Sequence, residues 1–322
     1  MWPRSPAKCS LLAIAVLGRI YGKEDRMDLQ KLTGSIVALV TPFNEDGSID
    51  YASLDKILEF QVTNGTDGIL VLGTSGESAT MTDAEDIAVA KFAVEHVGGA
   101  VPIFGGAGSN CTRESYNKSL ELEKVGVDGL LVITPYYNKS NEEGIYQHFK
   151  TVLDAIDVPA ILYNVPSRTG CSISVKNLER LSKHPRALAV KEASGSIGYA
   201  TEIAHCLGPD FGMFSGNDDM VLQLMSLGAR GVISVWANVM PKEVHEMCKN
   251  YLAGNIEEAR KTQLACLDLI HALFCEVNPI PVKQAMADMG LLQANYRLPL
   301  WPMTDEDHAR LCRAMEGVGL LG

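Results

Sequence analysis

Eight short apolar runs, rich in β-branched residues, recur along the chain and alternate with segments of helical periodicity. The runs are largely continuous in hydropathy, which is typical of parallel strands buried on both faces. They follow one another at roughly 20 to 32 residues, the spacing of βα units in a barrel of about 250 residues. They occupy residues 34–43, 67–78, 101–109, 128–138, 159–170, 187–195, 211–218 and 230–238. The pattern predicts an α/β fold, a (β/α)8 or TIM barrel.

The connecting segments support this assignment. The first of them, "DYASLDKILEFQVTNG", places Leu54, Ile57, Leu58 and Val62 on one helical face and reaches Gly65, a suitable C-cap. A doubly wound open sheet is the main competing fold. However, "GGAGSN" lacks the third glycine of a dinucleotide fingerprint, and no GxxxxGK[ST] motif occurs.

The chain divides into three parts. Residues 27–238 form the predicted barrel, and residues 239–322 are a predicted C-terminal helical extension. Residues 1–26 differ from the rest, because two basic residues precede a short apolar run, "LLAIAVLG". This outline fits either a targeting segment or a start codon placed too far upstream. The run is too short to span a bilayer, so we expect no membrane partner.

The composition limits the classes of function that the chain can have. A chain of 322 residues with 47% apolar residues can bury a sizeable core. Its formal net charge of -11 argues against a nucleic-acid partner, which needs clustered Lys and Arg. The eight cysteines contain no CxxC pair. The segment "VHEMC" has one histidine and one cysteine on a predicted helix, but no second pair completes a metal site. We therefore expect reduced thiols, no metal and a cytoplasmic location.

Polar residues end the apolar runs, and in a barrel such strand ends meet at the active-site face. They are Thr41, Thr74, Ser75, Glu77, Tyr136, Tyr137, Tyr163, Arg168, Lys191, Ser215, Asn217 and Ser234. Lys191 follows the apolar run "ALAV" and is expected to point into the barrel mouth. Burial lowers the pKa of a lysine, because the ammonium form loses hydration. The neutral amine that results is a nucleophile towards a ketone.

The neighbouring strand ends complete a possible site. Tyr163 can carry protons for a Schiff base on Lys191, with Tyr137 and Thr74 extending the relay of hydroxyls. The glycines and hydroxyls of "GTSGES", which contains Thr74 and Ser75, can receive an anion. The Arg168 guanidinium matches a carboxylate. The residues alone therefore predict a lysine-dependent aldolase that acts on acidic substrates.

Several long motifs occur in an order that resembles the pyruvate-dependent aldolase family of dihydrodipicolinate synthase and N-acetylneuraminate lyase. They are "GSIVALVTPF", "GTSGES", "TPYYN", "YQHF", "ILYNVPSRTG", "VKEASG", "SGND", "GVISVWAN" and "NPIPVK". The resemblance runs from about Thr33 to the C-terminus. "TPYYN" and the arginine of "YNVPSRTG" are similar to the synthase branch. The resemblance implies a class I lyase that condenses pyruvate with L-aspartate 4-semialdehyde in lysine and diaminopimelate biosynthesis.

The resemblance also implies roles for individual residues. Lys191 would form the imine with pyruvate, and Tyr163 would move protons to and from it. Thr74 and Tyr137 would complete the relay, with Tyr137 lent across a dimer interface to the neighbouring subunit. Ser75 would meet the pyruvate carboxylate.

Further expectations concern the aldehyde and the assembly. Arg168 would bind the carboxylate of aspartate semialdehyde, while Gly216 and the Ile233 carbonyl would border the cavity. No metal or organic cofactor would be needed. The family's usual assembly implies a homotetramer, a dimer of two tight dimers.

Members of the family are often inhibited by lysine at a dimer interface. The positions here that match the lysine site are Ser78, Ala79, Asn110, Glu114 and Tyr136. Lysine-sensitive relatives commonly carry histidine or glutamate at two neighbouring positions, which here are Asp83 and Asp86. We therefore predict weak to moderate inhibition by lysine.

Two other functions stay open from the sequence. A sialic-acid or related keto-acid aldolase, such as N-acetylneuraminate lyase, would differ in the aldehyde consumed and in the use of Arg168. A non-catalytic ligand-binding relative would keep the barrel, but it gives no reason to retain a costly buried amine.

Overall fold

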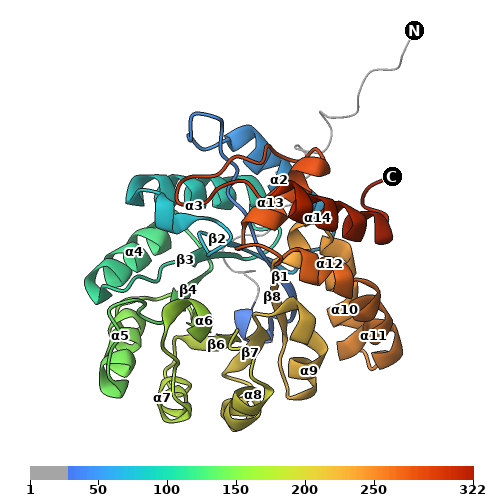
Figure 1. Cartoon of the computed structure of the whole chain (residues 1–322). Helices are drawn as coiled ribbons and strands as arrows, with labels where there is room; N and C mark the ends of the chain where they lie inside the picture. Colours follow the sequence, from blue (N-terminus) through green and yellow to red (C-terminus); the bar gives the residue numbers. More distant parts are fainter. Residues whose placement is uncertain (1–27) are drawn as a thin grey trace.

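The computed structural model describes residues 28–322, and it confirms the predicted barrel (Figure 1). Within these residues, eight parallel strands form one closed sheet in which β1 also pairs with β8. Each strand lies inside the segment predicted for it. The strands are β1 (Gly34–Ala38), β2 (Gly68–Val71), β3 (Ile103–Gly106), β4 (Gly129–Ile133), β5 (Ala160–Asn164), β6 (Ala187–Glu192), β7 (Gly212–Ser215) and β8 (Gly231–Ser234).

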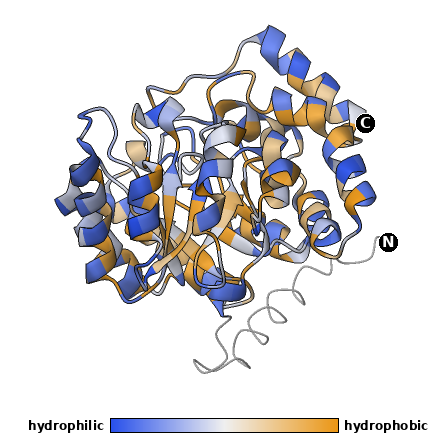
Figure 2. Cartoon of the chain, turned by 90° about the horizontal axis from the view of Figure 1, so that it is seen from below, coloured by the Kyte–Doolittle hydropathy of each residue, from blue (hydrophilic) through white to orange (hydrophobic). Residues whose placement is uncertain are grey.

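Apolar side chains pack on both faces of the strands. Ile36 and Phe214 belong to the core inside the barrel, whereas Val37 and Met213, their neighbours in sequence, belong to the core between strands and helices. Successive side chains on a strand point to opposite faces, so both faces need apolar residues. Figure 2 shows the hydrophobic central strands and the hydrophilic residues along the outer helices. This double burial explains the continuous apolar runs in the sequence.

Helices surround the strands. Those of the ring are α2 (Tyr51–Thr63), α3 (Asp83–Val97), α4 (Thr112–Val125), α5 (Glu142–Ala155), α6 (Pro166–Thr169), α7 (Val175–Leu181), α8 (Ile197–Ile203), α9 (Val221–Ser226) and α10 (Pro241–Leu252). A short 3-10 helix, η2 (Leu29–Lys31), precedes β1, and others lie in the connections, namely η3 (Ser78–Thr80), η4 (Ala204–Cys206), η5 (Asp218–Met220) and η6 (Trp236–Asn238).

Helix α2 shows where local periodicity succeeds and where it fails. Its predicted face is buried at Leu54, Ile57 and Leu58, and Val62 packs partly buried against the same core. Gln61, a polar residue that the apolar periodicity did not place on this face, is also buried. Gln61 is buried because its side-chain amide donates to the Ala237 carbonyl at 2.8 Å. The helix ends at Thr63 with Asn64 as its C-cap, one residue before the predicted glycine.

The last part of the chain is helical, as predicted. Its elements after the ring are α11 (Ile256–Ala265), α12 (Leu267–Ala272), α13 (Ile280–Asp288) and α14 (Asp305–Gly317). Helix α14 packs against α12 and α13 (Figure 1). Helix α10 contacts β1, so the segment 239–322 begins with the helix that completes the ring. The division of domains at residue 238 stays a prediction.

Within residues 28–322, no helix combines the length and the apolar character needed to cross a membrane. The predictions made for residues 1–26 lie outside the part of the chain that the structure describes.

Candidate active site

A cavity lies at the carboxyl ends of the barrel strands, on the face where a TIM barrel carries its chemistry. Its volume is about 190 Å³, which is small beside the roughly 300–1,000 Å³ of pockets that hold drug-sized ligands. It is therefore sized for a small metabolite. The predicted site residues that line it are Thr74, Ser75, Tyr163, Arg168, Lys191, Gly216 and Asn217.

Lys191 projects into this cavity from β6. The residue is only 5% exposed, and burial lowers the pKa of its amine from 10.5 to about 8. The charge of Asp218 acts in the opposite direction, and that of Arg168 adds to the effect of burial. A substantial fraction of the amine is therefore neutral near pH 7, as a nucleophile requires.

Tyr163 lies beside Lys191 because the two residues are register partners on β5 and β6. The Lys191 Nζ atom is 4.6 Å from the centroid of the Tyr163 ring. Burial raises the pKa of the Tyr163 phenol, while the charge of Arg168 and a hydrogen bond with the Thr74 side chain act against that rise. Tyr163 therefore stays protonated near neutral pH and can donate a proton to a group on the lysine.

The turn after β2 brings hydroxyl groups to the same cavity. Thr74 and Ser75 both line it, and Ser75 is buried. The turn is fixed to the barrel because the Thr41 hydroxyl donates to the Gly76 carbonyl at 2.7 Å. A Cβ atom at Gly76 would lie 2.9 Å from the Leu72 backbone nitrogen, so the tight turn requires glycine at that position.

Arg168 supplies a cation near the lysine from the short helix α6. Among the described residues, no carboxylate lies within ion-pair distance of its guanidinium. The charge of Arg168 nevertheless acts on the other two groups: it adds to the lowering of the Lys191 pKa and opposes the rise that burial causes in the pKa of Tyr163. An unpaired guanidinium at a cavity wall suits an anionic ligand, in particular a carboxylate.

Gly216 leaves the space that Lys191 occupies. A Cβ atom at this position would lie 2.5 Å from the Cβ of Ala193 and 3.1 Å from the Cε of Lys191. Any larger residue would therefore clash with Ala193 and crowd the end of the Lys191 side chain.

Other predicted residues lie outside the cavity of the single chain. Tyr137 is 90% exposed with a left-handed φ of 71°, and Ile233 is buried in β8 but is not part of the lining. The positions predicted to bind lysine are likewise absent from the cavity wall; they are Ser78, Ala79, Asn110, Glu114 and Tyr136.

At the predicted lysine site, the chain supplies an ammonium of its own. The Lys118 amine lies 2.8 Å from the Ser78 hydroxyl and 2.5 Å from an Asp86 carboxylate oxygen. Glu114 accepts a hydrogen bond from Ser109 at 2.8 Å. Two of the polar groups around this site are therefore already engaged by an internal cation.

Several residues at or near the site were not predicted from the sequence. Phe274 and Asn278 reach the cavity from the C-terminal helical segment, and Asn278 donates to the Ser75 hydroxyl at 3.0 Å. Asp218 is buried near Lys191, and one of its oxygens accepts from the backbone N–H groups of Val235 and Trp236. The acidic pair in "SGNDD" was a visible signal for Asp218, whereas no local pattern marked Phe274.

In the described chain, one group of side chains combines the chemistry of metal ligands within 4.8 Å, namely Asp288, His308 and Cys312. It lies between α13 and α14 and not in the cavity wall. The Nε2 atom of His308 is already 2.9 Å from an Asp288 oxygen, within hydrogen-bond distance. Nothing about this group connects it to the chemistry of Lys191.

The chain is similar over most of its length to proteins of one known family. The model of the dihydrodipicolinate synthetase family matches residues 31–317. The 4-hydroxy-tetrahydrodipicolinate synthase of Acetivibrio thermocellus is 46% identical over 289 residues, which are 90% of this chain and 98% of that protein.

Solved structures agree with this similarity. The dihydrodipicolinate synthase of Acinetobacter baumannii, described as chloride-inhibited and complexed with pyruvate, has a TM-score of 0.88 and 38% identity, covering 90% of this chain and 100% of that one. The DHDPS of Cyanidioschyzon merolae, with lysine bound, also has a TM-score of 0.88 and 38% identity, covering 90% of this chain and 99% of that one.

Proposed function

Because the chain belongs to the dihydrodipicolinate synthetase family, we infer that its cavity performs the reaction of a 4-hydroxy-tetrahydrodipicolinate synthase. That reaction is the Schiff-base condensation of pyruvate with L-aspartate 4-semialdehyde, a lyase reaction of lysine and diaminopimelate biosynthesis. The observation that carries the assignment is the buried Lys191 amine, with its lowered pKa, beside Tyr163 at the mouth of the barrel.

The first half of the reaction activates pyruvate. The neutral Lys191 amine adds to the ketone carbon, and loss of water from the carbinolamine gives the imine. Tyr163 supplies the proton that leaves with this water, and Thr74 hydrogen-bonds the phenol. Ser75, on the same turn, meets the pyruvate carboxylate. The Tyr163 phenolate then takes a methyl proton from the imine, which gives an enamine and restores the phenol.

The second half joins the two substrates. The enamine carbon attacks the aldehyde, and a proton converts the resulting alkoxide to the 4-hydroxyl group. The amino group of the former semialdehyde then adds to the imine carbon, closes the ring and releases Lys191 as an amine. One water molecule is lost over the whole reaction, and no oxidant or reductant takes part. We propose that no metal or organic cofactor is needed.

Arg168 selects the second substrate in this proposal. Its guanidinium has no carboxylate partner among the described residues and lines the cavity near Lys191. A guanidinium binds a carboxylate through paired N–H groups. It therefore holds the carboxylate of aspartate semialdehyde while the aldehyde end faces the enamine.

The exposure of Tyr137 is the reason for proposing that the chain forms a dimer. A side chain that is 90% exposed and held at a left-handed φ is poorly explained within a single chain. We propose that it completes the relay of a neighbouring subunit in a tight dimer, and that two such dimers form a homotetramer. Gly216 and the Ile233 carbonyl keep their proposed places at the border of the cavity.

Two further proposals concern regulation and location. Lysine inhibits weakly to moderately at the interface site that includes Ser78, Ala79, Asn110, Glu114 and Tyr136. The cysteines of the described chain are all free thiols, which fits a cytoplasmic enzyme.

The test is consumption of pyruvate by the purified protein, with aspartate semialdehyde in one sample and N-acetylmannosamine in another. We expect rapid consumption with the semialdehyde only. Consumption with the sugar instead would keep the Schiff-base chemistry but assign the protein to the lyase branch. No consumption with either aldehyde would contradict an enzymatic function and favour a ligand-binding relative.

A further inference from the structure

The turn that carries Thr74 and Ser75 ends in a buried acid. Glu77 lies at the end of this turn with a left-handed φ of 55°, and its side chain is 1% exposed. One of its oxygens lies 2.6 Å from the Nζ of Lys283, whose side chain is 0% exposed. Lys283 is on α13, 206 positions along the chain. A buried ion pair thus joins the active-site turn to the C-terminal helical segment.

The groups around Lys283 stabilise the positive charge of its amine. Its amine also donates to the Asn295 carbonyl at 2.6 Å. It lies 4.4 Å from the centroid of the Phe43 ring and 5.2 Å from that of Tyr296, so two aromatic rings stabilise the cation. Burial lowers the pKa of Lys283 and raises that of Glu77, while the charge of each partner acts against these shifts.

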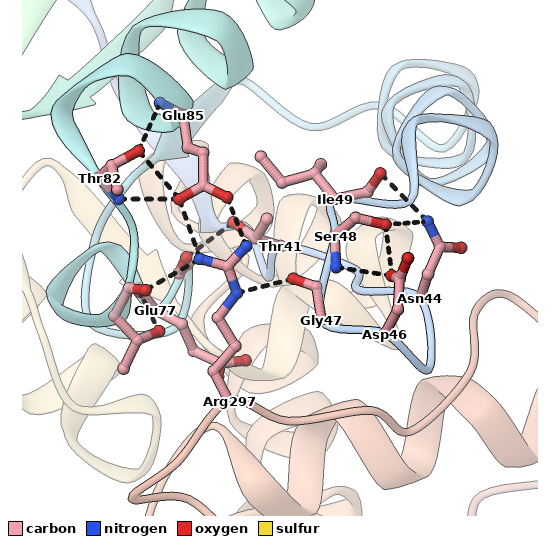
Figure 3. A network of polar contacts seen from close by, with 12 residues as sticks. Thr41, Asn44, Asp46, Gly47, Ser48, Ile49, Glu77, Thr82, Glu85 and Arg297 are labelled. Atoms are coloured by element: carbon pink, nitrogen blue, oxygen red, sulfur yellow. Dashed lines mark hydrogen bonds and ion pairs between the residues drawn. The ribbon is translucent and has the colours of Figure 1, made fainter.

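A second ion pair anchors the segment that holds Lys283. Arg297 donates to both carboxylate oxygens of Glu85, at 2.5 and 3.0 Å, and to the carbonyls of Gly47 and Thr80 at 2.9 Å each (Figure 3). Thr82 and Glu85 form the capping box that begins α3. The chain around residue 297 is therefore tied to the loop after β1 and to the start of α3, which fixes the Asn295 carbonyl nearby.

A buried ion pair of this kind contributes little net stability to the fold. Desolvation of two charges offsets much of their attraction, and an apolar pair of similar size is often equally stable or more stable. The retained pair therefore suggests a geometric role. The turn is clamped at three successive positions, because Ser75 contacts Asn278, the Gly76 carbonyl accepts from Thr41, and Glu77 binds Lys283.

We propose that Glu77 and Lys283 are positioning residues that set the turn carrying Thr74 and Ser75 at the distance from Lys191 needed to bind the pyruvate carboxylate. This inference rests on the proposed function. Neither side chain lines the cavity, so both act through the turn. Their loss should weaken pyruvate binding and leave the reactivity of the Lys191 amine largely unchanged.

The test variant is the doubly apolar Glu77→Met/Lys283→Met, which removes the charges together and leaves neither one unpaired. Because such replacements are often neutral for stability, we expect a thermal midpoint close to that of the parent. We expect KM for pyruvate to rise by about tenfold, the effect of losing roughly one charge-assisted hydrogen bond. Borohydride should still trap pyruvate fully on Lys191 when pyruvate is saturating.

A matched control is Glu121→Met/Lys124→Met, which replaces an exposed Glu–Lys pair on α4 by the same residues. It should keep the parental KM. If the buried double variant folds and also keeps the parental KM for pyruvate, the pair is only structural and the inference is wrong.

Glu77→Gln keeps the shape of the side chain and serves if the double variant does not fold. It should raise KM for pyruvate more than KM for the semialdehyde, and equal changes in both would overturn the inference. The parent protein separates the two proposals. If the parent itself traps no pyruvate, the proposed function fails. If the parent traps pyruvate and the variants bind it normally, the positioning role alone fails.

Discussion

The lowered pKa of Lys191 makes the rate of imine formation depend on pH in a defined way. An amine with a pKa of about 8 is neutral in about one molecule in ten at pH 7. An exposed lysine with a pKa of 10.5 would be neutral in only about one molecule in 3,000. Burial therefore increases the reactive fraction by about 300-fold at this pH.

The direction of the pH dependence follows from the charges of the ammonium and amine forms of Lys191. The ammonium form does not attack the ketone, so the rate should rise about tenfold per pH unit below 8 and level off above it. Asp218 stabilises the ammonium and raises the Lys191 pKa against the effect of burial. The Asp218→Asn variant should therefore reach its plateau at lower pH than the parent.

The assay is a timed incubation with limiting pyruvate, a borohydride quench and mass spectrometry of the peptide that contains Lys191. It is repeated from about pH 6 to pH 10 for the parent and for Asp218→Asn. A rate that continues to rise to pH 10 would refute the argument from burial. A plateau that does not move in Asp218→Asn would refute the role of the aspartate.

Three further predictions follow from the site. Arg168→Ala should retain borohydride trapping of pyruvate but lower kcat/KM for the semialdehyde by about 100-fold, the effect of losing a bidentate contact; equal loss of both would show that its assigned role is mistaken. Tyr163→Phe should lower kcat by about 100-fold, because it removes a proton carrier, and should change KM for pyruvate little. An unchanged kcat in steady-state assays would exclude Tyr163 from proton transfer. Lys118→Met should strengthen inhibition by lysine, because it frees Ser78 and Asp86; inhibition curves that coincide with the parent's, or a parent unaffected by millimolar lysine, would end the assignment of that site.

The barrel could be predicted from sequence because its strands carry their signal locally. A strand buried on both faces needs an uninterrupted apolar run, and each run ends where the catalytic face begins. Lys191 and Tyr163 could be placed at the same face for this reason. Their pairing across β5 and β6 then follows from the parallel register.

The other side of the cavity could not be predicted in this way. Asn278 meets Ser75 across 203 positions, and Lys283 meets Glu77 across 206. Helical periodicity in the last third of the chain shows which residues are apolar but not which strand end they contact. Glu77 was visible as a strand-end acid, but its burial and its partner required the tertiary structure.

The whole proposed reaction depends on Lys191 as the amine that binds pyruvate covalently. Incubation with pyruvate, borohydride reduction and mass spectrometry of the digested protein test it most directly, with Lys191→Ala as the control. We expect one reduced pyruvyl group on the peptide containing Lys191 and none on the variant. A label on another lysine, or no label on the active parent protein, would contradict it.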